Sequence, residues 1–130
     1  MSELEPAELA ARLARKAQED ATAVREFAAN PQIADSIIGF HAQQAAEKWL
    51  KAVMAARGIK QTRIHDIGRL IQLLEADGAE LPPVKEQLDE LTIYAVPLRY
   101  DELLDAEPLD HEAVVHLVEN ISDWADSQLA

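Results

Sequence analysis

Four polar residues, His41, Gln44, Lys48 and Lys51, follow one another at spacings of three, four and three along one stretch of the chain. At roughly 100° of rotation per residue, they fall on one arc of a helix. An imidazole, an amide and two ammonium groups on one ridge could donate hydrogen bonds and positive charge to an anion or a partner surface. The alternative is an ordinary solvated face, since Glu47 and Lys51 have the spacing of a weak i,i+4 ion pair.

A second candidate group follows the ridge in the sequence. Arg63 and His65 precede the expected start of the next helix, where backbone N–H groups point outward and favour phosphate. The alternative is that His65 and Asp66 only stabilise the start of that helix. Further along, Arg99 could bind a phosphate bidentately and Tyr100 could stack on a base, or both could serve the end and the packing of their own helix.

Other chemistry finds little support in the sequence. His111 and His116 are five residues apart and fall on different faces of a helix, so we expect them to be exposed and not to pair on a metal. The absence of cysteine excludes disulfides, thiolate catalysis and cysteine-bound zinc. There is also no glycine-rich phosphate loop. The sequence therefore predicts no metal and no cofactor.

Five amphipathic helices are expected to position these residues, joined by short connections. We place them at residues 7–28, 34–57, 66–76, 84–100 and 112–128, with breaks at Asn30-Pro31, Gly58 and Gly78. This pattern predicts an all-α, up-and-down bundle formed by one domain over residues 1–130. The core-facing arc of the second helix comprises Ile38, Ala42, Ala45, Ala46, Trp49, Val53 and Ala56.

The second helix also carries apolar residues away from that arc. Phe40, Leu50 and Met54 lie on its far side, and two apolar sides on one helix predict a second contact. The sequence therefore favours a homodimer.

The charge is negative overall but unevenly distributed. Twenty-four acidic residues against twelve basic ones give −12, which excludes a protein that coats nucleic acid in general. Between residues 41 and 69, however, six basic residues face only two acidic ones, which favours a local basic site. No apolar stretch is long enough for a membrane span and no leader peptide is evident, so we expect a cytoplasmic protein.

Three motifs, in this order, resemble the HEPN domain, a small all-helical family. They are residues 41–48 (HAQQAAEK) with Lys51-Ala52, then Thr62 with His65-Asp66, and last Arg99-Tyr100-Asp101, where many members carry Arg-Tyr-Pro-Asp. The resemblance covers residues 7–126. Many HEPN proteins are metal-independent ribonucleases whose motif has an arginine and a histidine separated by about four to six residues. Here eleven residues separate Arg99 from His111, so we expect no catalytic residue in this chain.

The resemblance implies a different role more directly. Domains of this type are often encoded beside a minimal nucleotidyltransferase, as a two-gene, toxin–antitoxin-like module, and the family name refers to nucleotide binding. We therefore expect a homodimer that binds a nucleotide, an RNA or such a partner through His41, Gln44, Lys48, Lys51, Arg63, His65, Arg99 and Tyr100. The alternatives are a ribonuclease toxin that uses His65 or His111, and a non-catalytic interaction module.

Overall fold

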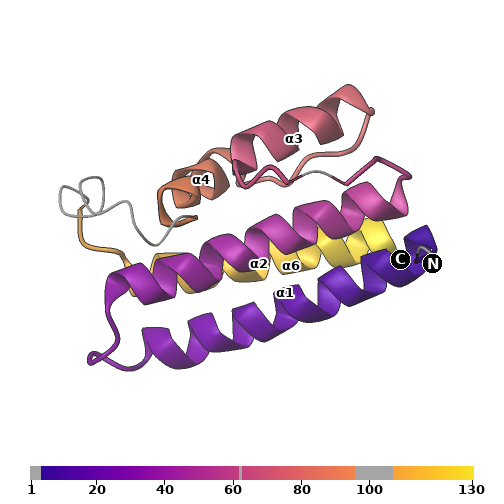
Figure 1. Cartoon of the computed structure of the whole chain (residues 1–130). Coiled ribbons are helices and arrows are strands. Elements are labelled where there is room, and N and C mark those ends of the chain that lie inside the picture. The colour runs from indigo at the N-terminus through magenta and orange to yellow at the C-terminus, as the bar shows by residue number, and fades with distance from the viewer. Residues whose placement is uncertain (1–3, 62, 96–106) are drawn as a thin grey trace.

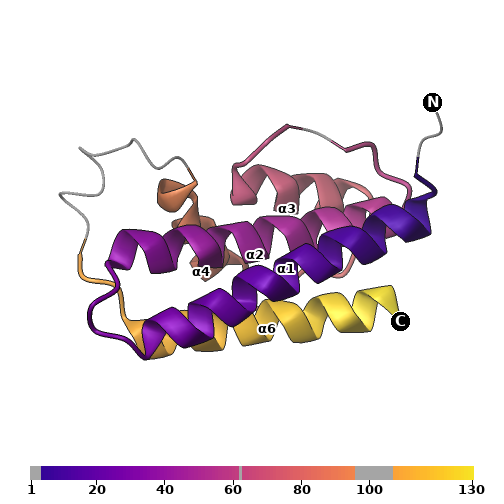
Figure 2. The same cartoon turned by 60° about the horizontal axis from the view of Figure 1, so that its bottom comes forward.

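The computed structural model describes residues 4–61, 63–95 and 107–130, which are helical apart from their connections. Its α-helices are α1 (Pro6–Ala28), α2 (Asp35–Ala56), α3 (Ile67–Ala76), α4 (Lys85–Glu90) and α6 (His111–Leu129), and the 3-10 helix η1 (Leu91–Tyr94) follows α4 directly. The long helices α1, α2 and α6 pack on one another, and α3 and η1 contact α2. Figure 1 shows α2 between α1 and the α3–α4 layer, and Figure 2 shows α6 on the side of the bundle away from α3. The expected all-α bundle is confirmed.

Residues with clear local preferences set most of the helix ends. Gly58 follows α2 with φ +76°, a conformation that favours glycine, and the Ile59 N–H bonds back to the Met54 carbonyl at 2.9 Å. At the N-termini of α3 and α6, the Asp66 carboxylate accepts the Arg69 N–H (3.2 Å), and the Asp110 carboxylate accepts the Ala113 N–H (3.0 Å). These residues place α3 beside α2 and begin α6 at His111.

The prediction of one regular α-helix that begins at residue 84 and continues to residue 100 is wrong. The α-helix ends at Glu90, and the chain tightens into η1 over Leu91–Tyr94. Here two side chains serve the start of α3: Asp89 accepts the Gly68 N–H (3.0 Å), and Thr92 accepts the Ile67 N–H (3.2 Å). Tertiary bonds to a neighbouring helix thus accompany the change of helix type. The rest of that expected helix, with Arg99 and Tyr100, lies outside the described residues.

The core is built around α2. Its expected inward residues are buried from Ile38 to Val53, and only Ala56, at the C-terminal end, is exposed. Leu50 and Met54, however, are fully buried within the single chain. The expectation that these two residues form a free second apolar side is therefore wrong, because the helices across α2 from α1 cover that side.

Three polar residues of α2 are also buried: Gln43, Glu47 and Lys51. Burying charge is costly unless the groups are paired and hydrogen-bonded. These three residues therefore need partners within the bundle. In the part of the chain that the structure describes, no helix has the length and apolarity that a membrane crossing needs.

Candidate functional site

Asp20 of α1 joins two of the expected site residues into what we call the Asp20 cluster (Asp20, His41, Lys48). One carboxylate oxygen lies 2.9 Å from His41 Nδ1, and the other accepts a bond from Lys48 Nζ at 2.5 Å. The rings of Phe27 and Phe40 lie edge-on to the His41 ring, at centroid distances of 5.6 and 5.4 Å. His41 and Lys48 thus lie together around one carboxylate, and Asp20 supplies the counter-charge of Lys48.

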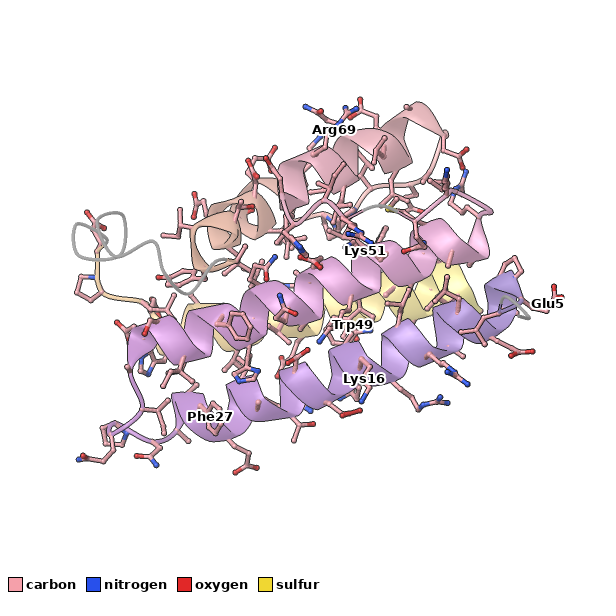
Figure 3. The ribbon with its side chains drawn as sticks, in the orientation of Figure 1. Glu5, Lys16, Phe27, Trp49, Lys51 and Arg69 are labelled. Atoms are coloured by element: carbon pink, nitrogen blue, oxygen red, sulfur yellow. The ribbon has the colours of Figure 1, made fainter. Side chains whose placement is uncertain are left out.

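Glu47 joins a second group, the Glu47 cluster (Gln43, Gln44, Glu47, Lys51, His65). Its Oε1 accepts bonds from Gln43 Nε2 (2.9 Å) and His65 Nδ1 (3.0 Å), and its Oε2 accepts one from Lys51 Nζ (3.1 Å). Gln43 also donates to the His65 carbonyl (3.2 Å) and accepts from Gln44 Nε2 (2.7 Å). Figure 3 shows Lys51 on the side of α2 that faces α3, whereas Trp49 lies between α2 and α1. The cluster therefore ties α2 to the segment that leads into α3.

The Glu47 carboxylate is ionised at neutral pH. Burial alone would raise the pKa of Glu47, but the hydrogen bonds from Gln43 and His65 and the charge of Lys51 outweigh burial and lower the pKa below its ordinary value of 4.5. An ionised carboxylate can only accept, so His65 Nδ1 must carry the proton in this contact. The side chain of Glu47 is 7% exposed and that of His65 is 58% exposed. A buried anion therefore fixes one nitrogen of an imidazole whose body faces solvent.

Two cations in the same loop are uncompensated. Lys60 and Arg63 are exposed, and neither has an ion-pair or hydrogen-bond partner within residues 4–61, 63–95 and 107–130. Arg57, by contrast, is held by Asp77 through its carboxylate (2.8 Å) and its carbonyl (2.9 Å). Among the described residues, Arg63 makes no hydrogen bond or ion pair with either cluster, so the structure does not join all the expected site residues into one network. Their expected neighbour Thr62, like Arg99 and Tyr100, lies outside the described residues.

Asp20 and Gln43 were not predicted as site residues, and Glu47 was considered only as an ordinary i,i+4 partner of Lys51, a pair that the structure contains. Gln43, Glu47 and Lys51 are spaced four apart beside the core arc, so the sequence carried a signal for a polar line at the edge of the core. Asp20 carried no such signal, because its role depends on how α1 is aligned with α2.

His111 does not behave as expected. Its side chain is only 32% exposed, with Nε2 at 2.7 Å from Asp35 Oδ1 and Nδ1 at 3.2 Å from the Ala28 carbonyl. Asp35 Oδ2 accepts the Leu109 N–H as well (2.9 Å). We call this group the helix-end clasp (Ala28, Asp35, Leu109, His111), because it joins the end of α1 to the starts of α2 and α6.

Protonation suits the geometry of the helix-end clasp. Both ring nitrogens of His111 face acceptors, which only the imidazolium can satisfy at once. The hydrogen bond to Asp35 accordingly raises the pKa of His111 above 6.5, and the same bond lowers the pKa of Asp35 below 3.8. His111 thus has a structural partner at each nitrogen and is not a free acid–base group.

Comparison with known proteins gives one match. A family model described as the HEPN domain matches residues 10–128, which is most of the chain. The match spans both clusters and the helix-end clasp. No curated protein and no solved structure matches the chain.

Proposed function

Because this chain belongs to the HEPN domain family, we propose that it binds a phosphate-bearing ligand, a nucleotide or an RNA, on the face formed by α2 with residues 59–61 and 63–66. We propose further that it is one component of a two-gene module, in which a minimal nucleotidyltransferase is the protein partner. The chain itself contributes binding and no bond-breaking chemistry.

One observation carries this proposal: buried Glu47 holds the exposed His65 in place, in the same loop as the uncompensated Lys60 and Arg63. Phosphate oxygens are acceptors, and charge-assisted bonds from histidine, lysine and arginine are the donors that suit them best. Lys48 and Lys51 already have carboxylate partners. A ligand would therefore gain more from Arg63 and His65 than from Lys48, which is shared with Asp20. The proposal extends to Arg99 and Tyr100.

Calorimetry with ATP, GTP and a short single-stranded RNA tests the proposal on the native protein. A charge-assisted bond contributes roughly 1.5–3 kcal/mol, so Arg63→Ala should weaken binding by about tenfold or more. Lys48→Ala should weaken ligand binding less. Arg99→Ala tests whether the binding site extends to Arg99. Lys16→Ala is the matched control, because Lys16 is a lysine of α1 whose side chain is 66% exposed and pairs with the exposed Glu19. If none of the three ligands binds, or if Arg63→Ala binds as well as Lys16→Ala, the proposal should be abandoned.

A second candidate function, a metal-independent ribonuclease, is favoured by one contact. An ionised carboxylate that fixes one nitrogen of a histidine is the arrangement of a general base, and Glu47 stands in that relation to His65. Two features oppose it. The arginine–histidine spacing of HEPN ribonucleases is absent, and the ring nitrogens of His111 are both engaged in the helix-end clasp.

An RNA cleavage assay in the presence of a chelator separates the two functions. We expect no cleavage by the purified protein. Cleavage that is lost in His65→Ala and kept in His116→Ala would assign the ribonuclease activity and overturn the non-catalytic function.

We also propose that the protein is a homodimer, although the reason differs from the one that the sequence suggested. Ile37 is 45% exposed, and Phe40, three residues later on α2, is half-buried. Two large apolar side chains on one turn of an outward face support a contact between copies. If the protein proves to be an interaction module only, this is the surface that it would use.

A further inference from the structure

A groove lies between α4–η1 and α6, away from the two clusters of α2. It encloses about 460 Å³. Its apolar lining includes Val84, Tyr94, Val114 and Leu117, of which Tyr94 and Val114 are buried and the other two are partly exposed. Figures 1 and 2 both show α4 and the start of α6 at the same end of the bundle. We refer to it as the α4–α6 groove.

Three carboxylates supply the formal charge of the groove, whose other polar lining residues are Gln87, His116 and Asn120. Glu90, Glu107 and Asp110 stand along it, all exposed, and none of its lining residues is a lysine or an arginine. Asp110 uses one oxygen to cap α6, whereas Glu90 and Glu107 make no hydrogen bond or ion pair within the described part of the chain. The groove therefore combines apolar surface with unpaired negative charge.

The surrounding sequence strengthens this charge. From residue 75 to the end of the chain there are fifteen acidic residues and two basic ones. A cleft lined by one sign of charge focuses the field and attracts the opposite sign. An anionic ligand is therefore disfavoured here, and the groove differs in kind from the face of α2.

We infer that the α4–α6 groove docks a lysine- or arginine-rich segment of a protein partner that carries one apolar stripe. From Asp110, the N-cap of α6, to Asn120 within it, the groove follows the helix for about 15 Å at the helical rise, which suits two or three turns of an amphipathic helix. Apolar side chains of the segment would cover Val114 and Leu117, and its cations would face Glu90 and Glu107. This inference does not depend on phosphate binding at α2.

The probe is a synthetic peptide of about 12 residues with leucine and lysine at helical spacing. Two sibling peptides serve as controls: one replaces every lysine by glutamate, and the other replaces every leucine by serine. Calorimetry at roughly physiological salt, where weak surface attraction is screened, should show binding of the leucine–lysine peptide. Equal binding of the control peptide in which serine replaces leucine would show attraction to net charge alone and overturn the inference. Failure of the leucine–lysine peptide to bind would also overturn it.

Paired variants locate the site. Glu90→Gln/Glu107→Gln should weaken binding about fivefold or more, because it removes two unpaired carboxylates that face the peptide. The control Asp123→Asn/Asp126→Asn removes the same charge from exposed residues of α6 that neither line the groove nor pair with a residue that lines it in the described part of the chain, and it should change the affinity less than twofold. Equal losses in the two doubles would overturn the inference. All four substitutions are on the surface, and circular dichroism checks that the fold is kept.

A second copy of the chain is the competing occupant, since its α2 face is basic. The mass measured by light scattering over a range of protein concentrations distinguishes self-association from binding of a foreign partner. Growth beyond a dimer that disappears in Glu90→Gln/Glu107→Gln would assign the groove to self-association and overturn the inference of a foreign partner.

Discussion

At the residue scale, Glu47 explains why the polar side of α2 can be buried at all. A carboxylate that is almost enclosed needs donors for both oxygens, and it has three side-chain donors from α2 and the following loop. Lys51, itself 11% exposed, depends on Glu47 for its counter-charge. The same residues that hold the fold together thus orient His65, the most exposed member of the cluster.

Removing the charge of Glu47 should therefore destabilise the fold. Glu47→Gln keeps the size of the side chain but leaves Lys51 buried without a counter-ion, so we expect a loss of about 3 kcal/mol in the free energy of unfolding. Urea unfolding at neutral pH measures it. Glu19→Gln breaks an exposed pair and should cost about 0.5 kcal/mol or less. Replacing both partners, in Glu47→Gln/Lys51→Met, should recover part of the loss. Similar effects of Glu47→Gln and Glu19→Gln would contradict the role of Glu47.

The helix-end clasp should make stability depend on pH. The pKa of His111 is raised in the folded state, so its contribution is full below the unfolded value of 6.5 and is lost as the pH rises through the raised value. The pKa of Asp35 is lowered, so its contribution is present above 3.8 and is lost as the pH falls through the lowered value. The helix-end clasp is therefore strongest in the acidic range between them.

The test is the difference in unfolding free energy between the native protein and His111→Asn. It should be largest near pH 5.5 and should shrink by pH 9, in contrast to His116→Asn, whose histidine is 66% exposed. A difference that stays constant over this range would mean that His111 is not held as an imidazolium.

At the element scale, local signals predicted the helices whose ends carry their own capping residues. Proline in the first turn of α1, Gly58 after α2, and Asp66 and Asp110 before α3 and α6 act over a few residues, so the sequence alone placed these ends closely. The break at η1 was missed because Asp89 and Thr92 bond to α3, about twenty residues earlier in the chain. Asp20 and Asp35 were missed for the same reason: their partners are fixed by how whole helices pack.

Close packing of η1 on α2 gives a prediction at this scale. A Cβ added to Gly39 would lie 2.5–2.7 Å from the ring of Tyr94. Gly39→Ala should therefore destabilise the protein by about 1–3 kcal/mol, although alanine is the better helix former. Thermal unfolding measures it. In a Tyr94→Leu background the loss should be smaller, because the ring is gone, and an unchanged loss would contradict the contact.

At the scale of the whole molecule, the charges are sorted between two surfaces. The basic residues between positions 41 and 69 belong to α2, α3 and the loop that joins them, whereas the acidic excess lies on the C-terminal half. The sequence showed this division directly, because charge can be counted along the chain. It could not show that Asp20 compensates Lys48. With Lys51 paired to Glu47, Arg57 to Asp77, and Arg69 bonded to Gln72, Lys60 and Arg63 are the basic residues between positions 41 and 69 that have no side-chain partner in the described part of the chain.

The proposed homodimer is tested by mass. Light scattering at micromolar concentration should give about twice the chain mass of 14.4 kDa. Ile37→Asp, which places charge on the exposed apolar turn of α2, should shift the mass to that of one chain. Leu4→Asp, at the other large hydrophobic residue that is exposed among those described, should not. A mass of one chain for the native protein would contradict the dimer.

Ligand binding at the α2 face is the central claim, and an amide NMR titration with ATP and with a short RNA tests it most directly. It reports where a ligand binds, which affinity alone does not. We expect the amide signals of Gln44, Lys48, Arg63 and His65 to shift and to saturate together, and these shifts should weaken in Arg63→Ala. The absence of shifts, or saturable shifts confined to α6 and the α4–α6 groove, would contradict it.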